Sequence, residues 1–414
     1  MIQDSFLGSN INDVKAHNLR AILLSLLFSE PVFRAQLAED TGLSRTTISN
    51  LVDELLAAEI VFEKGIEEID GPRRVGRPRT AVYLNPDAGY ALGAHIGVGV
   101  FRVGLVNLRN ELLENELCWF DPKTPYEQVF EDIADRLEAI IEKSGVDRNK
   151  IIGLGVGPPG MVDYFTGMLT LAPNLNWENI PLRDWFSERM AMPVIVENNT
   201  RAMALAESYF GSAKYSSSLL FVYGRYGVGS GIVVDRQVFR GSRFSAGEIG
   251  HTLLVIDDSA DCDIEKCVQL ESLVSERALL DQAEEFAKND PEGVLAVLLA
   301  DKSYERKIDA LIEAGRQGDP NAIAIFNRAS RLLGIALTNL VNILNPERIV
   351  LGGMYWQAKD LILPTVTDIV THSVVGEIGE KVIIEGSAFG WRAGLIGAST
   401  IALIRLFYSN SEEQ

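Results

Sequence analysis

The feature that most restricts the fold of this chain is an α/β pattern that occurs twice. The first set starts with three strand-like segments, Ala91–Ile96, Phe101–Asn107 and Glu111–Trp119. A helical pattern at 126–143 and a further strand at Ile151–Val156 follow them. The second set starts at Leu219–Tyr223, passes through glycines at 224, 227, 229 and 231, and continues in Ile232–Val234 and Val238–Phe239. Strands that alternate with a covering helix are typical of α/β domains. The pattern therefore predicts two similar α/β lobes that face a cleft.

The rest of the body is mainly helical. A long helical stretch over roughly 272–344 follows the second set, and the strand Arg348–Leu351 and a helix at Gly394–Leu406 complete it. At 414 residues the chain exceeds what one core usually contains, so two or three domains are expected.

Targeting segments and disulfides are not indicated. No run approaches the roughly 18 apolar residues of a membrane span, and the N-terminal segment lacks the basic and apolar regions of a signal peptide. The three cysteines, Cys118, Cys262 and Cys267, are too few for a secreted disulfide framework. A cytoplasmic protein is therefore expected.

The N-terminal segment predicts three helices. Between Val14 and Phe28 apolar residues recur at spacings of three and four. A short helix over Arg34–Asp40 precedes a turn at Gly42, and Ser44 is a suitable N-cap for the third helix. The residues expected to be buried in the third helix are Ile48, Leu51, Val52, Leu55 and Leu56.

Small polar side chains and an arginine are left on the outer face of the third helix. They are Arg45, Thr46, Thr47, Ser49 and Asn50. A short glycine-containing turn, followed by a helix that begins with such residues, is typical of the helix-turn-helix, whose second helix enters the major groove of DNA. An ordinary helical hairpin is the alternative.

The segment after these helices predicts a wing. Strand-prone runs at 59–64 and 80–84 enclose a loop rich in glycine and arginine, which carries Arg73, Arg74, Arg77 and Arg79. An extended basic segment can lie in a narrow minor groove, although a solvated linker has the same composition. Asn85-Pro86 closes the unit, so we expect a winged helix-turn-helix domain over 1–86 and a separate body over 87–414.

The net charge of −19 limits where DNA could bind. Residues 1–85 carry nine Lys or Arg and twelve Asp or Glu, so most of the negative charge lies on the body. Repulsion from DNA phosphates would act on most of that surface. Any DNA contact is therefore expected to be local to the N-terminal unit.

Several motifs of the body resemble those of the ROK family, which joins repressors, open reading frames and kinases. They are Gly157-Pro158-Pro159-Gly160-Met161-Val162-Asp163, Pro173-Asn174-Leu175-Asn176-Trp177, Ala246-Gly247-Glu248-Ile249-Gly250-His251 and Asn345-Pro346-Glu347-Arg348-Ile349-Val350-Leu351-Gly352-Gly353. The N-terminal segment and Gly76-Arg77-Pro78 resemble ROK regulators of the xylose- or N-acetylglucosamine-repressor type, whereas free-standing ROK kinases lack this segment. The resemblance covers essentially the whole chain. It implies a two-lobed, actin-like sugar-kinase fold, but activity must be argued from the site.

Three parts that phosphoryl transfer needs differ from the pattern of ROK kinases. Where the family has Asp-Ile-Gly-Gly-Thr-Lys, this chain has His95-Ile96-Gly97-Val98-Gly99-Val100. Arg225 and Tyr226 replace a glycine and a threonine of the second phosphate loop, where they would fill the nucleotide's space, though an arginine there could bind an anion. Asn199 replaces the catalytic aspartate and cannot accept a proton near neutral pH. We therefore expect no enzyme activity and no ATP cofactor.

The resemblance implies that the sugar-binding residues are kept. Planar polar side chains suit adjacent sugar hydroxyls in a cleft that excludes water. By similarity to the family, hydroxyl contacts are assigned to Gly160, Asn174, Asn198, Asn199, Glu248, His251 and Glu271. Taken singly, Gly160 could serve only a tight turn and Asn174 only a loop cap. The amide at 199 leaves the preferred sugar open.

ROK proteins usually hold zinc with one histidine and three cysteines. Here Cys262 and Cys267 keep the spacing of the last two cysteines, and Ala260 stands where the first would be. His251, Cys262 and Cys267, with a carboxylate such as Asp261, could hold zinc tetrahedrally. The alternative is a pair of thiols without a metal.

Together these features predict a sugar-responsive transcriptional regulator, usually a repressor in this family, that acts on operator DNA for carbohydrate-utilisation genes. The sugar or sugar derivative would favour one lobe arrangement and so change the spacing of paired DNA-binding domains, which requires a homodimer or homotetramer. An active ROK sugar kinase with an added DNA-binding domain is the alternative, and a regulator controlled by a protein partner is a third. The sugar, the operator and the direction of the response are not fixed by the sequence.

Overall fold

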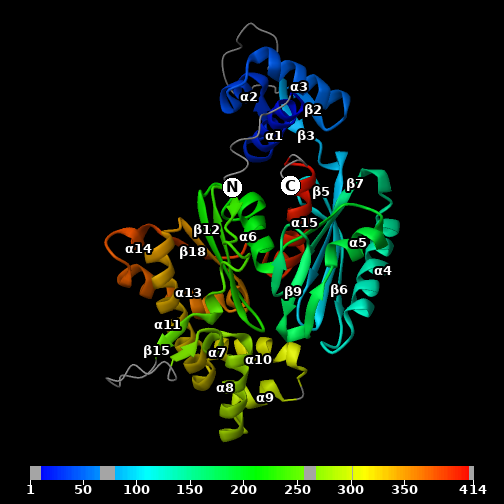
Figure 1. Cartoon of the computed structure of the whole chain (residues 1–414). Helices are drawn as coiled ribbons and strands as arrows, with labels where there is room; N and C mark the ends of the chain where they lie inside the picture. Colours follow the sequence, from blue (N-terminus) through cyan, green and yellow to red (C-terminus); the bar gives the residue numbers. More distant parts are fainter. Residues whose placement is uncertain (1–10, 66–79, 256–266, 301, 410–414) are drawn as a thin grey trace.

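The N-terminal part of the chain is a small helical unit. The computed structural model describes residues 11–65, 80–255, 267–300 and 302–409 (Figure 1). Helix α1 (Ile11–Ser29) is followed by α2 (Arg34–Thr41) and α3 (Arg45–Ala57). Ser44 caps α3, because its hydroxyl accepts the amide N–H of Thr47 at 3.1 Å, and the sequence had predicted this cap.

A β-hairpin completes the unit. Strands β2 (Val61–Gly65) and β3 (Thr80–Leu84) pair antiparallel where the two runs were expected. Strand β1 (Val32–Phe33), which the sequence did not predict, pairs with the other edge of β3. The loop between β2 and β3, with Arg73, Arg74, Arg77 and Arg79, lies outside the described residues.

The first lobe of the body is built on a sheet with the strand order β11-β7-β4-β5-β6. Its strands are β4 (Tyr90–Ile96), β5 (Val100–Asn107), β6 (Leu112–Trp119), β7 (Ile151–Gly157) and β11 (Val194–Val196). Helices α4 (Tyr126–Ser144) and α5 (Leu182–Met190) cover one face, and α15 (Ala393–Leu406) packs on the other. A small sheet of β8 (Met161–Asp163), β9 (Met168–Ala172) and β10 (Trp177–Ile180) extends this lobe beside the cleft.

The second lobe repeats this plan with the strand order β14-β13-β12-β17-β18. Its strands are β12 (Ser218–Gly224), β13 (Val228–Val234), β14 (Gln237–Val238), β17 (Arg348–Gly353) and β18 (Ile383–Gly386). Helix α6 (Asn199–Phe210) packs against β12, β13 and α15, so α6 and α15 lie side by side between the two sheets. The expectation of two similar lobes is confirmed.

The glycines at 229 and 231 have a packing role. They lie in the extended strand β13, which begins at Val228, and not in a loop that cradles phosphate. A Cβ at Gly231 would lie 2.5 Å from that of Ala204 on α6. These glycines therefore allow a helix to lie close against the sheet.

The expected helical stretch after residue 271 is divided into separate helices. They are α7 (Glu271–Val274), α8 (Glu276–Asn289), α9 (Val294–Leu299), α10 (Tyr304–Arg316) and α11 (Pro320–Leu344). The second lobe also holds α12 (Met354–Gln357), α13 (Lys359–Ser373), α14 (Ile378–Lys381) and the strand pair β15 (Leu253–Val255) and β16 (Cys267–Gln269). Within the described part of the chain, no helix is long and apolar enough to cross a membrane.

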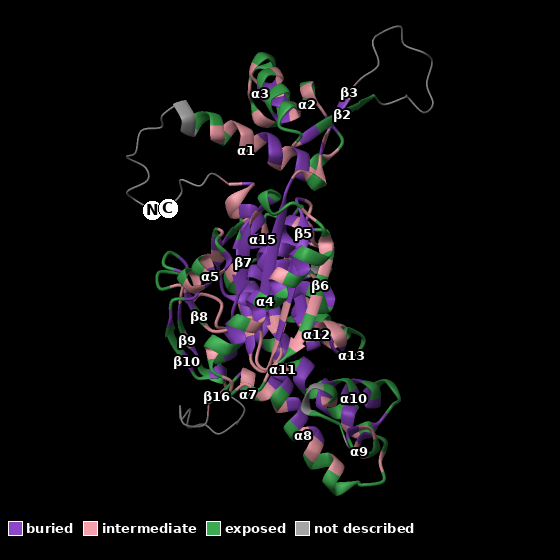
Figure 2. Cartoon of the chain, turned by 90° about the vertical axis from the view of Figure 1, so that its right-hand side faces the viewer, coloured by how far each residue is buried: buried purple, intermediate pink, exposed green. Residues whose placement is uncertain are grey.

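Buried residues join the N-terminal unit to the body. One apolar cluster runs from Ile22 and Leu26 of α1 to Tyr209 of α6 and Ile404 of α15. Figure 2 shows the same concentration of buried residues around α15 and the sheet strands beside it, below the N-terminal helices. The N-terminal unit is thus packed on the body and touches the helices between its lobes.

Candidate functional site

A cavity of about 380 Å³ opens between the two lobes. This volume lies in the range of about 300–1,000 Å³ that is usual for small-molecule sites. Its wall is formed by the β4–β5 turn, the loop after β7, the start of α6, the β12–β13 turn and the loop that follows β14. It brings together all the residues that the resemblance assigned to sugar binding: Gly160, Asn174, Asn198, Asn199, Glu248, His251 and Glu271.

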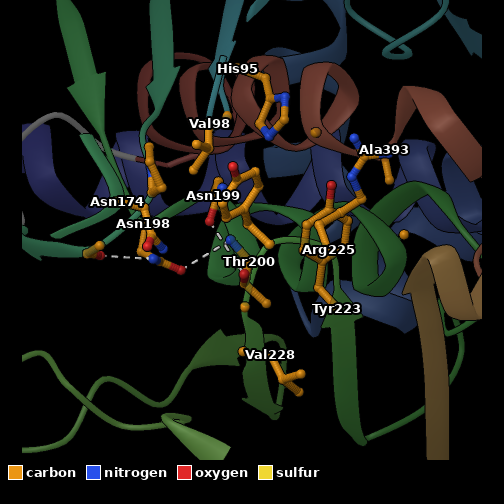
Figure 3. Close-up of a pocket in the computed structure, with 18 of the residues that line it drawn as sticks. His95, Val98, Asn174, Asn198, Asn199, Thr200, Tyr223, Arg225, Val228 and Ala393 are labelled. Carbon is orange, nitrogen blue, oxygen red and sulfur yellow. Dashed lines mark hydrogen bonds between the residues drawn. The ribbon is translucent and has the colours of Figure 1, made fainter. Parts of the chain in front are cut away.

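Asn198 supports the wall of the cavity. Its side-chain oxygen accepts the N–H groups of Thr200 at 3.0 Å and Arg201 at 3.1 Å, and its amide donates to the carbonyl of Gly160 at 2.9 Å (Figure 3). These bonds cap α6 and fix the loop after β7. Gly160 has φ +88°, and a Cβ there would meet the backbone of Leu171, so only glycine fits.

The side-chain amides of Asn174 and Asn199 make fewer hydrogen bonds within the protein than that of Asn198. Asn174 is exposed on the short 3-10 turn Pro173–Leu175, and its side chain makes no hydrogen bond to a described residue. Asn199 is 8% exposed and accepts the Thr200 hydroxyl at 3.3 Å. These amides are therefore the ones best placed to bind a ligand's hydroxyl groups.

Two carboxylates, Glu248 and Glu271, also line the cavity. Burial raises the pKa of Glu248, the charges of Arg201 and His251 oppose this shift, and the charge of Glu271 adds to it. Glu271 accepts the backbone N–H of Val228 at 3.3 Å. Carboxylate oxygens in this setting can accept hydrogen bonds from sugar hydroxyls.

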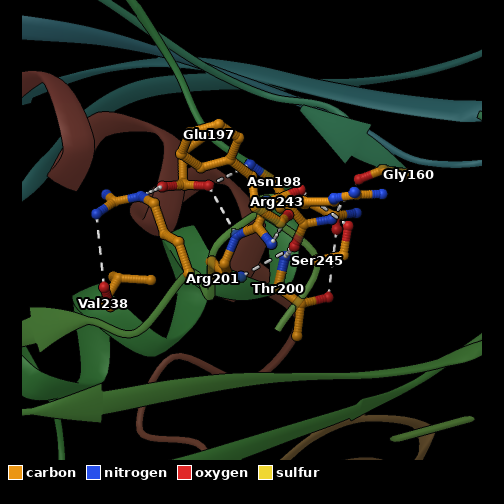
Figure 4. Close-up of polar contacts among 11 residues, drawn as sticks. Gly160, Glu197, Asn198, Thr200, Arg201, Val238, Arg243 and Ser245 are labelled. Atoms are coloured by element: carbon orange, nitrogen blue, oxygen red, sulfur yellow. Dashed lines mark hydrogen bonds and ion pairs between the residues drawn. The ribbon is translucent and has the colours of Figure 1, made fainter. Parts of the chain in front are cut away.

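A buried ion network lies directly behind the cavity. The Glu197 side chain is fully buried and receives Arg201 Nε at 2.8 Å and Arg240 Nε at 2.7 Å (Figure 4). Arg201 also donates to the carbonyl of Phe244 at 2.7 Å. The network therefore joins α6 to the loop that carries Glu248.

The other end of the cavity holds His95 and Arg225, two of the residues that differ from the kinase pattern. His95 lies between Asn199 and Arg225 in the view of Figure 3. Burial lowers the pKa of His95 to about 3, and the charges of Arg102 and Arg225 act in the same direction. Arg102 and Trp391 also line this end, and the sequence reasoning did not find them. Arg102 could have been found from strand register, because it pairs with His95 across β4 and β5.

The zinc ligands are described only in part. His251 is exposed at the end of a short 3-10 turn, and Cys267 begins β16. Cys262 and Asp261 lie outside the described residues. Among the residues that are described, no group of three or more His, Cys, Asp or Glu side chains is arranged to hold a metal. The zinc site stays a prediction.

The predicted DNA-reading residues lie on α3 with different degrees of exposure. Arg45, Thr46 and Asn50 are exposed, whereas Thr47 and Ser49 are half-buried. Arg34 holds α3 to the hairpin, since its guanidinium lies 2.7 Å from Asp53 and 2.7 Å from Glu63. The exposed residues therefore sit on a helix whose position is fixed.

Two α/β lobes around a cleft give the body a sugar-kinase-like fold. The chain belongs to the ROK family, whose model matches residues 91–405. It is 30% identical to the xylose repressor of Caldicellulosiruptor bescii, over 87% of this chain and 88% of the relative. A crystal structure of a ROK family transcriptional regulator, a homologue of the Escherichia coli Mlc protein, shares the fold with TM-score 0.75 at 24% identity, over 93% of this chain and 97% of that one.

A ROK glucokinase shares a smaller part of the chain. The crystal structure of the Streptomyces griseus enzyme, in complex with glucose and AMPPNP, matches with TM-score 0.63 at 28% identity. The match covers 99% of the glucokinase but 76% of this chain. The shared part is therefore the body, and the N-terminal unit is an addition to it.

Proposed function

We propose that this chain is a sugar-responsive transcriptional repressor that binds operator DNA and does not transfer phosphate. The observation that carries the proposal is that an N-terminal helical unit, which exposes Arg45 and Asn50, is packed on a kinase-like body. The cavity of that body is lined by Asn199, which by the resemblance replaces the catalytic base of ROK kinases. The similarity to xylose repressors supports it.

The N-terminal unit supplies the DNA-binding part. Helices α2 and α3, joined through Gly42 with φ +69°, and the β2–β3 hairpin fit a winged helix-turn-helix. Its reading helix would be α3 and its wing the segment between β2 and β3. Because paired half-sites give specificity, we propose a homodimer or homotetramer that presents two such units over residues 1–86.

The body supplies the sensing part. A kinase needs a carboxylate to orient or deprotonate the attacking hydroxyl and small residues beside the phosphates. By the resemblance to ROK kinases, Asn199, His95 and Arg225 take these places, and all three line the cavity. The cavity can therefore bind a sugar without activating it, and we propose a sugar or sugar derivative as the effector.

Helix α6 is the element that connects the two parts. Its first residue, Asn199, lines the cavity, and its residues through Tyr209 are buried. Twelve residues of α-helix span about 18 Å. At the far end the ring of Tyr209 lies 5.9 Å from that of Phe28 in α1. A displacement of α6 on ligand binding would therefore reach the N-terminal unit.

The end of α1 is held by both lobes. From the second lobe, Lys214 donates to the carbonyl of Leu27 at 2.9 Å and Tyr215 donates to that of Phe28 at 3.1 Å. From the first lobe, Arg109 forms an ion pair with Glu30. A change in the angle between the lobes must alter these contacts, which makes them the place where sugar binding would act on DNA binding.

Two of the three cleft asparagines, Asn174 and Asn198, should respond differently to substitution. Asn174→Ala is expected to weaken sugar binding about tenfold, because a ligand hydrogen bond is lost, and to leave thermal stability nearly unchanged. Asn198→Ala should instead lower the free energy of unfolding by about 1–2 kcal/mol, because it removes the cap of α6. Calorimetric sugar titration and urea unfolding of each variant measure the two effects. If Asn174→Ala unfolds the chain and keeps full sugar affinity, Asn174 is structural.

Phe28 should be needed for the sugar response. In Phe28→Ala the ring contacts with Tyr209 and Arg236, the latter 3.9 Å from the ring centre, are lost while α3 is untouched. We expect operator binding without sugar to persist and the sugar effect on affinity, about tenfold or more in the unmodified chain, to fall below about threefold. Val14→Ala, an exposed position on the same helix, is the matched control. An unchanged sugar effect in Phe28→Ala would remove this contact from the coupling.

A further inference from the structure

We propose that the end of the cleft formed by His95, Arg102 and Arg225 binds a phosphate group, carried either by inorganic phosphate or by a phosphorylated ligand. This site is separate from the amides that would bind sugar hydroxyls. It does not depend on the proposed repressor function, because the ligand would be bound by the body alone.

The two arginines come from different lobes and meet at this end of the cavity. Arg102 lies on β5 directly opposite His95, and Arg225 lies in the β12–β13 turn. Both side chains line the sugar cavity and also an adjoining cavity of about 650 Å³. A ligand at this point would therefore touch both lobes.

The two arginines differ in their ion pairing within the described chain. Arg225 is paired with Glu276, whose carboxylate is 1% exposed and lies 3.1 Å from Arg225 Nε. No described carboxylate forms a salt bridge with Arg102, whose guanidinium instead stacks on the ring of Trp391 at 4.2 Å. Burial and the charge of Arg225 lower the pKa of Arg102 to about 10, so Arg102 is still charged at neutral pH. Arg102 therefore has no ion-pair partner among the described residues, although Asp121 and Asp309 line the adjoining cavity.

His95 offers an unused hydrogen-bonding group at the same place. Its side chain is 7% exposed, and Nε2 has no hydrogen-bond partner among the described residues. A buried polar atom without a partner is costly, and a bound ligand atom would supply the missing bond. Because the pKa of His95 is about 3, the imidazole is neutral at pH 7 and can donate one N–H.

A phosphate fits this set better than a neutral group. Guanidinium groups bind phosphate oxygens through pairs of N–H bonds, and an anion between two arginines removes their mutual repulsion. Tyr223, whose pKa is raised by burial, adds a neutral hydroxyl near both arginines. Two further carboxylates, Glu248 and Glu271, line the same cavity, and Glu271 accepts the backbone N–H of Val228 at the start of β13.

The test is a titration of the full chain with inorganic phosphate in a phosphate-free buffer, followed by calorimetry. Arg102→Gln removes the unpaired charge and is expected to weaken phosphate binding about tenfold or more, since charge-assisted bonds to phosphate are lost. Arg392→Gln is the matched control, because Arg392 approaches the same Trp391 ring, at 5.9 Å, but does not line the cavity. Arg225 is a poorer choice, because its loss would leave Glu276 buried without its partner.

A second titration, with pentoses, hexoses and their phosphate esters, decides whether the bound phosphate group belongs to inorganic phosphate or to a phosphorylated ligand. An ester that binds more tightly than both its parent sugar and inorganic phosphate indicates one ligand across both ends of the cleft. Independent binding of sugar and inorganic phosphate indicates a separate anionic effector. Either result supports the site if Arg102→Gln weakens binding of the phosphate-bearing ligand while the thermal unfolding midpoint of the variant is unchanged.

If neither phosphate nor any ester binds, the proposal is wrong. It is also wrong if the Arg102→Gln and Arg392→Gln variants bind phosphate with equal affinity. Sugar-dependent operator binding would be unaffected by that failure.

Discussion

Replacing Arg201 with methionine is expected to lower the free energy of unfolding by about 3–5 kcal/mol, because the substitution removes the buried one of the two arginines that pair with the buried carboxylate of Glu197. Arg201 is 2% exposed and Glu197 is fully buried, so water cannot replace the lost 2.8 Å contact. The bond from Arg201 to the carbonyl of Phe244 is lost as well. The urea midpoint of unfolding measures this loss.

Arg240→Met is the matched control for this prediction. Arg240 donates to the same Glu197 carboxylate at 2.7 Å, but its side chain is 25% exposed and lies 3.8 Å from the ring centre of Tyr164. Because water can reach the guanidinium, its loss should cost only about 1–2 kcal/mol. Equal costs for the two substitutions would show that burial of Arg201 does not determine the strength of the network.

The network also bears on ligand binding. It holds the loop from Phe244 to Glu248 against α6, so a partly unfolded network would misplace one wall of the cavity. We therefore expect that Arg201→Met also weakens sugar binding, whereas Arg240→Met affects it less. Sugar titrations below the unfolding temperature of each variant separate this effect from the loss of stability.

The double substitution Arg45→Ala with Asn50→Ala should weaken operator binding about 100-fold or more. Both side chains are exposed on α3, and each contact to a base edge is typically worth about 1–3 kcal/mol. Neither side chain takes part in the packing of α3, whose buried residues are Ile48, Leu51, Val52 and Leu55. Operator titrations at a fixed salt concentration measure the loss.

The control for the DNA-binding variant is Arg277→Ala. Arg277 is exposed on α8 in the body, so its substitution removes the same charge far along the chain from the N-terminal unit. We expect operator affinity to change less than about twofold, because a distant surface charge is screened by salt. Similar losses in both variants would mean that net charge, and not α3, determines DNA binding.

The parts of the fold that local patterns determine were predictable. Apolar residues at spacings of three and four identified α1 and α3, and the Ser44 cap fixed where α3 begins. Helix α6 was not found, because its residues from Asn199 to Tyr209 are buried on every side and show no polar face. The short strands β8 to β10 were missed because segments of this length give little periodicity.

The candidate site, too, was predictable from the sequence only in part. Family motifs led to residues that all line one cavity, but they did not separate Asn198, which caps α6, from Asn174, whose amide is left for a ligand. That distinction depends on hydrogen bonds that only folded geometry reveals. Arg102 and Trp391 meet through strand register and the position of α15, so no sequence motif contains both.

The most direct test of the proposed function is operator binding by the unmodified full chain, measured with and without sugars. An operator site selected from random DNA is titrated at fixed salt in the presence of individual pentoses and hexoses, and ADP release from ATP is assayed in parallel. We predict that one sugar or sugar derivative changes operator affinity by about tenfold or more and that no sugar gives ADP release. Operator binding that no carbohydrate alters, or phosphorylation of a sugar by the chain, would contradict a kinase-like body that has become a sensor.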